Sequence, residues 1–130
     1  MVSEMTPRQL RPCPRTPNCV STQSADAAHR MEPLAYSDLE EARARLLAVL
    51  GAMGTRSNAK VVTVEPAYVR AEFRSTLFRF VDDVEFLFDE KAKRLHFRSA
   101  SRIGRSDFGV NRKRMEEIAR EYQARTPGRK

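Results

Sequence analysis

The sequence predicts an α+β domain with a four-stranded antiparallel sheet, two helices packed on one face of that sheet, and an extended N-terminal arm. Two stretches with helical periodicity flank a central region of four strand-like stretches. Short turns join these four stretches, as in an antiparallel meander. The chain has 130 residues, enough for one hydrophobic core. We therefore expect a single domain at residues 12–125, between a flexible N-terminal segment (1–11) and a flexible C-terminal tail (126–130).

The arm is expected within residues 1–36, which contain five of the seven prolines and show no periodicity. We expect it to become ordered near Asn18 and to run along the domain. The N-terminus lacks the apolar stretch of a secretory signal, so the sequence as given predicts a cytoplasmic location. No run in the chain approaches the ~20 apolar residues that a membrane span needs.

Both cysteines, Cys13 and Cys19, lie in this arm. Two thiols cannot form a tetrahedral zinc site by themselves. Pro14 and Pro17 bend the loop between them in a way that would allow a disulfide to close. Because no export signal is visible, we expect reduced structural thiols, with a conditional disulfide as the alternative.

The first helix is expected over residues 37–54. Ser37 and Glu40 have the spacing of a capping box, in which Ser37 closes the N-terminus and Glu40 bonds back to it. Gly54 suits the position after the last turn. Apolar residues recur at spacings of three and four through the segment, namely Leu39, Ala42, Leu46, Leu50 and Met53.

Four strands should follow, at residues 60–65, 68–74, 82–88 and 94–98. In the second, Val69, Ala71 and Phe73 alternate with charged residues, which indicates one buried and one wet face. Residues 75–80 are apolar and fit either a bulged continuation of this strand or an ordered loop. The last helix is expected at residues 108–125, with Ser106 or Asp107 as its N-cap. Its apolar stripe comprises Val110, Met115, Ile118, Ala119 and Tyr122.

The net charge of +7 is concentrated in one place. Residues 98–114 contain six basic side chains and a single acidic one, Asp107. A general nucleic-acid-binding surface would spread such charge more widely, and the aromatic-glycine pattern of RNA-binding sheets is missing. Nucleic acid is therefore an unlikely partner. The cluster points to a local site or to ion pairs with acids elsewhere in the fold.

This segment joins the last strand to the last helix and could bind an anion. Helix N-termini present free backbone N–H groups, and arginines add bidentate donors. No phosphate-binding loop motif is present. We expect a non-enzymatic module that binds a small anion or an anionic lipid head group here. The candidate ligand-binding residues are Arg98, Ser99, Ser101, Arg102, Asp107, Asn111 and Arg112.

A structural or protein-interaction role without a ligand is the main alternative. Arg98 and Arg102 would then pair with Asp82 and Asp83, Asp107 would cap the helix, and Asn111 would bond loop carbonyls. The two aspartates could also hold a metal or serve a hydrolase-like enzyme as acid and base. However, a metal usually needs more carboxylates, and Arg98 is the expected partner of this pair. We therefore assign no catalytic residue, metal or cofactor.

Three blocks of sequence, at residues 13–21, 82–86 and 98–114, together resemble the domain of unknown function family 1499. The resemblance covers residues 12–124. It implies a small single-domain protein with no established activity, from a family found in bacteria and in plastid-bearing eukaryotes. It also implies that many relatives are exported or lipid-anchored. Asn18, Cys19, Asp82 and Asp83 match the family motif, and we expect them to form a network that holds the fold. Arg105 stands where many relatives have an aromatic residue, which makes this copy more basic.

Overall fold

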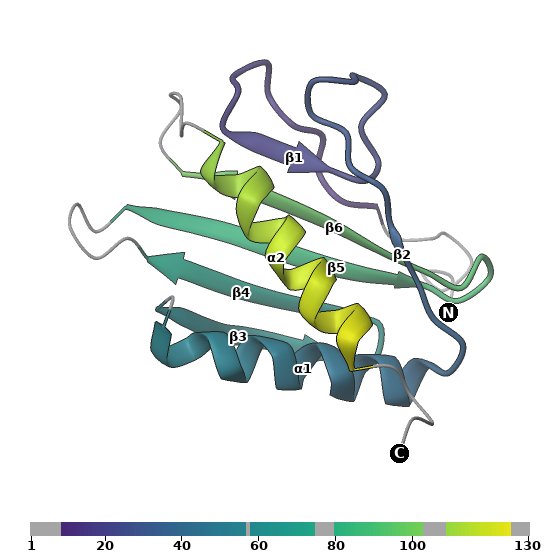
Figure 1. Cartoon of the computed structure of the whole chain (residues 1–130). Coiled ribbons are helices and arrows are strands. Elements are labelled where there is room, and N and C mark those ends of the chain that lie inside the picture. The colour runs from purple at the N-terminus through teal and green to yellow at the C-terminus, as the bar shows by residue number, and fades with distance from the viewer. Residues whose placement is uncertain (1–8, 57, 75–79, 103–108, 126–130) are drawn as a thin grey trace.

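The computed structural model describes residues 9–56, 58–74, 80–102 and 109–125. They form two helices and one six-stranded sheet (Figure 1). In chain order the elements are β1 (Cys19–Ser21), β2 (Leu34–Ala35), α1 (Leu39–Arg56), β3 (Ala59–Glu65), β4 (Tyr68–Arg74), β5 (Val81–Asp89), β6 (Arg94–Ser101) and α2 (Val110–Ala124). The α+β class is confirmed, but the expectation of four strands is wrong.

The sheet has the order β1-β6-β5-β4-β3, and β2 also pairs with β6. All of these pairings are antiparallel. The four predicted strands correspond to β3 to β6, and the two additional ones are short strands of the N-terminal arm. With three and two residues, β1 and β2 are too short to show an alternating pattern. Both strands form by pairing with the backbone of β6, and the sequence does not show that the arm reaches β6 in the folded chain.

The element ends show three further differences. Asp38, and not Ser37, caps α1, because its carboxylate Oδ2 accepts the N–H of Glu41 at 2.8 Å. The helix also continues past Gly54 to Arg56. Strand β6 extends three residues beyond the predicted end at residue 98, because Ser99 and Ala100 pair with β1. The open question about residues 75–80 lies almost wholly outside the described residues.

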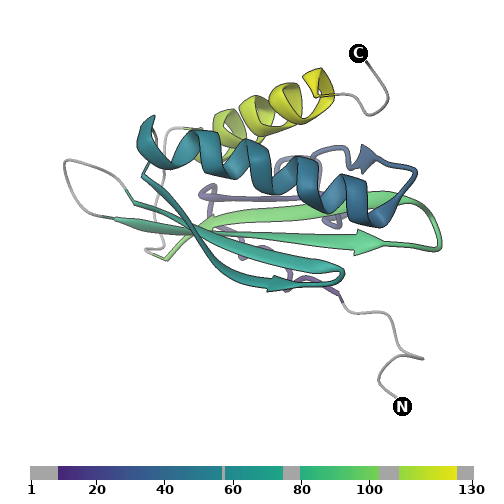
Figure 2. The ribbon, with the colours of Figure 1, turned by 90° about the horizontal axis from the view of Figure 1, so that it is seen from below.

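Alternation in the sheet assigns each side chain to one of two faces. Val69, Phe86 and Phe97 lie opposite one another on neighbouring strands and are buried. They share one core with Leu46 of α1 and Ile118 of α2. In Figure 2 both helices lie on the same side of the sheet. We call this side the helix face and the other side the open face.

The first described residues of the N-terminal arm, 9–13, lie across the open face, where Figure 2 shows the start of the coloured chain on the side away from the helices. Leu10 packs there in a small cluster with Tyr68 of β4 and Leu87 of β5. Its backbone N–H donates to Gln23 Oε1 at 3.0 Å. Leu10 and Arg11, which we expected in the flexible N-terminal segment, therefore belong to the described part of the domain.

Candidate functional site

The predicted site residues do not form a single site, because neighbouring residues of a strand point to opposite faces. On β6, Ser99 and Ser101 lie on the helix face, whereas Arg98 and Arg102 lie on the open face. The same alternation separates Asp82 from Asp83 on β5. The two carboxylates therefore cannot act as an adjacent acid and base or as a shared metal site. No group of three or more His, Cys, Asp or Glu side chains that could hold a metal is found in the described part of the chain.

On the helix face, Asn111 joins α2 to the sheet edge. Its side chain is almost completely buried. The amide Nδ2 donates to the carbonyl of Asn18 and to Ser101 Oγ, both at 3.2 Å. The amide Oδ1 accepts from Ser99 Oγ and, at 2.9 Å, from Arg114 Nη1. Both donors and both acceptor positions of the amide are thus used within the protein. The expectation that Asn111 bonds a loop carbonyl is confirmed.

Arg114 completes this buried network, and it was missing from the predicted site. Its Nη2 lies 2.9 Å from Asp82 Oδ2, and its guanidinium lies 4.7 Å from the centre of the Phe73 ring. Both charged side chains are largely buried, with 13% and 10% exposed. Position 114 lies one helical turn beyond Asn111 and so on the same side of α2. The three-residue spacing between Asn111 and Arg114 is the sequence feature that could have identified Arg114 as part of the network.

On the open face, Asp83 is the centre of a partly exposed ion cluster. Arg102 Nε and Nη2 donate to its two carboxylate oxygens at 2.8 and 3.0 Å. Arg70 Nη1 lies 3.0 Å from Oδ1, and Arg102 also bonds Glu72 at 2.8 Å. The hydrogen bond from Arg102 lowers the pKa of Asp83, and the neighbouring positive charges add to this effect. The predicted pairing of Arg102 with Asp83 is confirmed.

Arg98 pairs with neither aspartate, so that expectation is wrong. The register places Glu85, and not Asp82 or Asp83, opposite it on β5. The arm covers Arg98, which is only 6% exposed and donates from Nη2 to the carbonyl of Pro12 at 3.3 Å. Burial lowers its pKa, and the nearby positive charge of Arg11 lowers it further.

The remaining two candidates lie at the start of α2. Arg112 donates to the carbonyls of Ala28 and Arg30 at 3.1 and 3.3 Å, so it holds a loop of the arm. Asp107 lies outside the described residues, as does Ser106. The N-cap of α2 is Gly109, and no side chain caps it, so the predicted cap is wrong. Its φ of 80° is a conformation that glycine adopts without steric cost.

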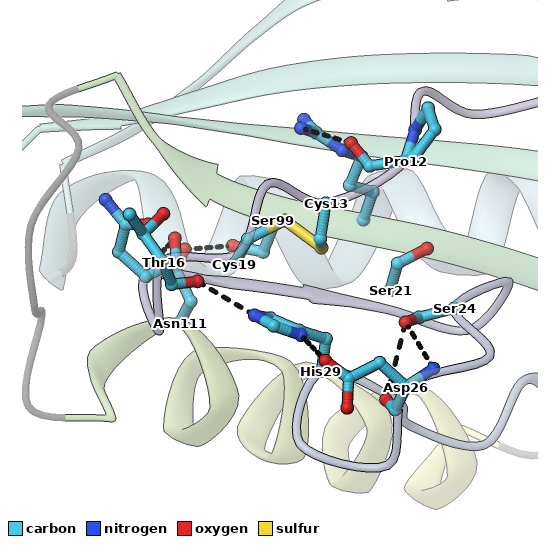
Figure 3. The surroundings of a disulfide bond; sticks show 12 residues. Pro12, Cys13, Thr16, Cys19, Ser21, Ser24, Asp26, His29, Ser99 and Asn111 are labelled. Atoms are coloured by element: carbon cyan, nitrogen blue, oxygen red, sulfur yellow. Dashed lines mark hydrogen bonds and ion pairs between the residues drawn. A yellow bond between two sulfur atoms is a disulfide. The ribbon is translucent and has the colours of Figure 1, made fainter.

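Cys13 and Cys19 form a disulfide, so the expected reduced thiols are wrong (Figure 3). Cys19 lies in β1, where its pairing with Ala100 anchors one end of the bond in the sheet. Such bonds are typical of oxidising compartments. His29 holds the loop within the disulfide, since its Nε2 lies 2.8 Å from the carbonyl of Thr16 (Figure 3).

His29 and Asp26 form a second contact that the sequence did not predict. The His29 Nδ1 lies 2.7 Å from Asp26 Oδ2. Each ring nitrogen of His29 therefore faces an acceptor, one a carboxylate and the other a carbonyl. A hydrogen bond from the backbone N–H of Ala28, followed by that from His29, lowers the pKa of Asp26. These hydrogen bonds stabilise the ionised carboxylate of Asp26.

A groove of about 600 Å³ opens beside the disulfide. Residues 9–13 of the arm form one wall and residues 21–26 form the other, while His96 of β6 completes the lining. No sequence pattern marks this groove, because its walls meet only when residues 9–13 cross the open face. None of the seven predicted ligand-binding residues lines it.

The polar side chains of the groove include a cation, a carboxylate, hydroxyls, amides and an imidazole. Arg11 is exposed, and its positive charge adds to the lowering of the pKa values of Asp83 and Arg98. Burial lowers the pKa of His96, which favours the neutral ring. Thr22 Oγ1 accepts the N–H of Phe97 and lies 2.8 Å from His96 Nδ1. The same hydroxyl lies 3.4 Å from the carbonyl of Phe97, to which it can donate.

The architecture is that of a small α+β domain with helices on one side of an antiparallel sheet and a disulfide-anchored arm on the other. A family model described as "Protein of unknown function (DUF1499)" matches residues 9–121. The chain belongs to this family, which confirms the resemblance seen in its three sequence blocks. Comparisons with curated proteins and with solved structures found no match. No helix in the described ranges is long and apolar enough to cross a membrane.

Proposed function

We propose that the protein is a non-enzymatic module that binds a small anionic ligand, and that the groove beside the disulfide is its binding site. The observation that carries this proposal is the exposed guanidinium of Arg11 in the wall of the groove. Arg11 is an exposed cation in one wall of the groove, whereas Asp26, the acidic residue of the lining, is held by His29 Nδ1 and the Ala28 N–H. The groove therefore favours a ligand that brings negative charge.

The other polar groups suit the same ligand. The His96 ring and the Ser24 hydroxyl add polar groups to the lining. Gln23 accepts the Leu10 N–H with Oε1, which leaves its amide N–H groups as donors. A carboxylate or phosphate group at Arg11, with a polar remainder along these donors, would match the lining.

The strand-to-helix corner is a weaker candidate for the same function. Ser99, Ser101 and Asn111 use their hydrogen bonds on one another and on Asn18. The arginines of that segment are engaged too, with Arg102 on Asp83 and Arg112 on backbone carbonyls. These contacts support the alternative that the corner holds the fold, as expected for the network containing Asn18, Asp82 and Asp83.

The test is an NMR titration of the oxidised, isotope-labelled protein with citrate and glycerol 3-phosphate, and with glycerol as the neutral control. We expect saturable shifts at residues 9–13 and 21–26 with both anions and none with glycerol. Arg11→Gln should weaken binding about tenfold or more, because a charge-assisted contact is lost. Arg15→Gln is the matched control, since Arg15 is an exposed arginine outside the lining.

Two outcomes would contradict the proposal. Shifts centred on Asn111 and Arg112 would place the anion at the strand-to-helix corner instead. The absence of any saturable shift at millimolar ligand would favour a structural or protein-interaction module. Cosedimentation with phosphatidylglycerol vesicles distinguishes a lipid head group from a free anion. If the protein binds these vesicles and Arg11→Gln does not, the ligand is an anionic lipid head group.

A further inference from the structure

We propose that the Cys13–Cys19 disulfide is a redox switch for the groove, and that a dithiol reductant opens the groove by releasing the arm. The arm supplies the wall formed by residues 9–13, so its release removes one side of the site. The part of the proposal that concerns ligand binding rests on the proposed function. The release of the arm does not depend on it.

The two cysteines of the disulfide differ in burial and in how firmly the fold holds them. Cys19 is 1% exposed and is held in β1 by its pairing with β6. Cys13 is partly exposed, lines the groove, and directly follows the arm segment that crosses the open face. The bond therefore joins the arm to the sheet at the end of the groove wall (Figure 3).

This exposure decides which sulfur a reductant reaches. A thiolate of the dithiol attacks the Sγ of Cys13, a mixed disulfide forms there, and Cys19 leaves as a thiolate that takes up a proton. The second thiol of the reductant then attacks its own sulfur in the mixed disulfide. Cys13 is released as a thiol and the reductant becomes a cyclic disulfide. Two electrons pass from the reductant to the cystine, and air or an oxidised dithiol reverses the step.

Once the bond is open, few contacts keep the arm in place. The described contacts are the hydrogen bond from the Leu10 N–H to Gln23, the one from Arg98 to the Pro12 carbonyl, and the packing of the Leu10 side chain. The wall requires five residues to be fixed, and each loses backbone entropy on ordering. Two hydrogen bonds and one apolar side chain do not offset that loss, whereas the disulfide reduces it by restricting the detached arm.

The loop on the other side of Cys13 has its own anchor. The carbonyl of Thr16 is held by His29, and this contact does not involve either cysteine. Reduction should therefore release residues 9–13 while the loop around Thr16 keeps its contact with His29. The sheet itself should also remain folded, since the core between the sheet and the helices includes none of residues 9–13.

The experiment compares amide hydrogen exchange of the full chain before and after treatment with dithiothreitol. We expect the Leu10 amide to exchange roughly 50-fold faster in the reduced protein, the factor that corresponds to opening a disulfide loop of this length. The amides of Phe86 and Phe97 should keep their protection, which shows that the domain stays folded. The Cys13→Ser/Cys19→Ser variant should exchange like the reduced protein and should not respond to dithiothreitol.

Ligand binding is measured on the same two states with citrate as the probe. Weaker citrate binding in the reduced protein, together with faster Leu10 exchange, supports the whole proposal. Unchanged protection of Leu10 after complete reduction overturns it, whatever citrate does. If Leu10 is released but citrate binds neither state, the arm switch stands and the proposed function fails. If the double variant does not fold, reduction of the unaltered chain provides the same readout.

Discussion

The two faces of the sheet carry similar ion pairs in different surroundings. On the helix face, Arg114 and Asp82 are largely buried and are tied to the amide of Asn111. On the open face, Arg102 is about half exposed in its pair with Asp83. A buried charge that loses its partner cannot be hydrated, whereas an exposed one returns to water. The comparison predicts that equivalent substitutions have large effects on the helix face and small effects on the open face.

The largest effect should follow from Arg114→Met. This change leaves the Asp82 carboxylate buried without its partner and should reduce the free energy of unfolding by about 3 kcal/mol. Urea denaturation measures the loss. Arg120→Met is the matched control, since Arg120 is an exposed arginine of the same helix, and it should change stability by less than ~0.5 kcal/mol. Equal losses of unfolding free energy in the two variants would show that the buried Arg114–Asp82 pair stabilises the protein no more than an exposed arginine does.

A smaller loss is expected for Asn111→Ala. The substitution removes four hydrogen bonds of one amide and leaves the Asn18 carbonyl without this donor, which should cost about 2 kcal/mol. Ser101→Ala, which removes a single acceptor, provides the graded comparison and should cost less. If Asn111→Ala unfolds at the same urea concentration as the unaltered chain, the network does not hold α2 to the sheet.

The smallest effect should come from Asp83→Asn, and it should depend on pH. The pKa of Asp83 is lowered in the folded state from its ordinary value of 3.8, mainly by Arg102. Its contribution to stability is therefore complete above pH 3.8 and is lost as the pH falls through the lower folded-state pKa. We expect a difference of about 1 kcal/mol at neutral pH, because the cluster is partly exposed. The difference between the two proteins should vanish in acid, and thermal unfolding at a series of pH values measures it.

Much of the sheet could be predicted from short-range pattern. Strand β4 has the predicted bounds, and Val69, Ala71 and Phe73 are buried as their alternation indicates. By contrast, β1 pairs with β6 across about eighty residues, and nothing in three residues of sequence signals that pairing. The alternation rule would also have separated Asp82 from Asp83, had it been applied to the candidate site as it was to the core.

In the second helix, the hydropathy pattern does not predict correctly which residues are buried. Val110, assigned to the apolar stripe, is 44% exposed, whereas its neighbour Asn111 is almost completely buried. A polar residue is stable at that position because Ser99, Ser101, Arg114 and the Asn18 carbonyl satisfy its amide. Most of those partners come from outside α2, so hydropathy alone predicts wrongly that Val110 is more buried than Asn111.

The sequence by itself determined the α+β class, the four long strands, both helices, the family and the clustering of charge in residues 98–114. These features depend on residue type and on periodicity over a few residues, which a single chain displays directly. Only the tertiary structure decided which charges meet, how many strands the sheet has and where a groove lies. Each of these depends on contacts between segments that are distant in the sequence, and such contacts leave no periodic signal in the chain.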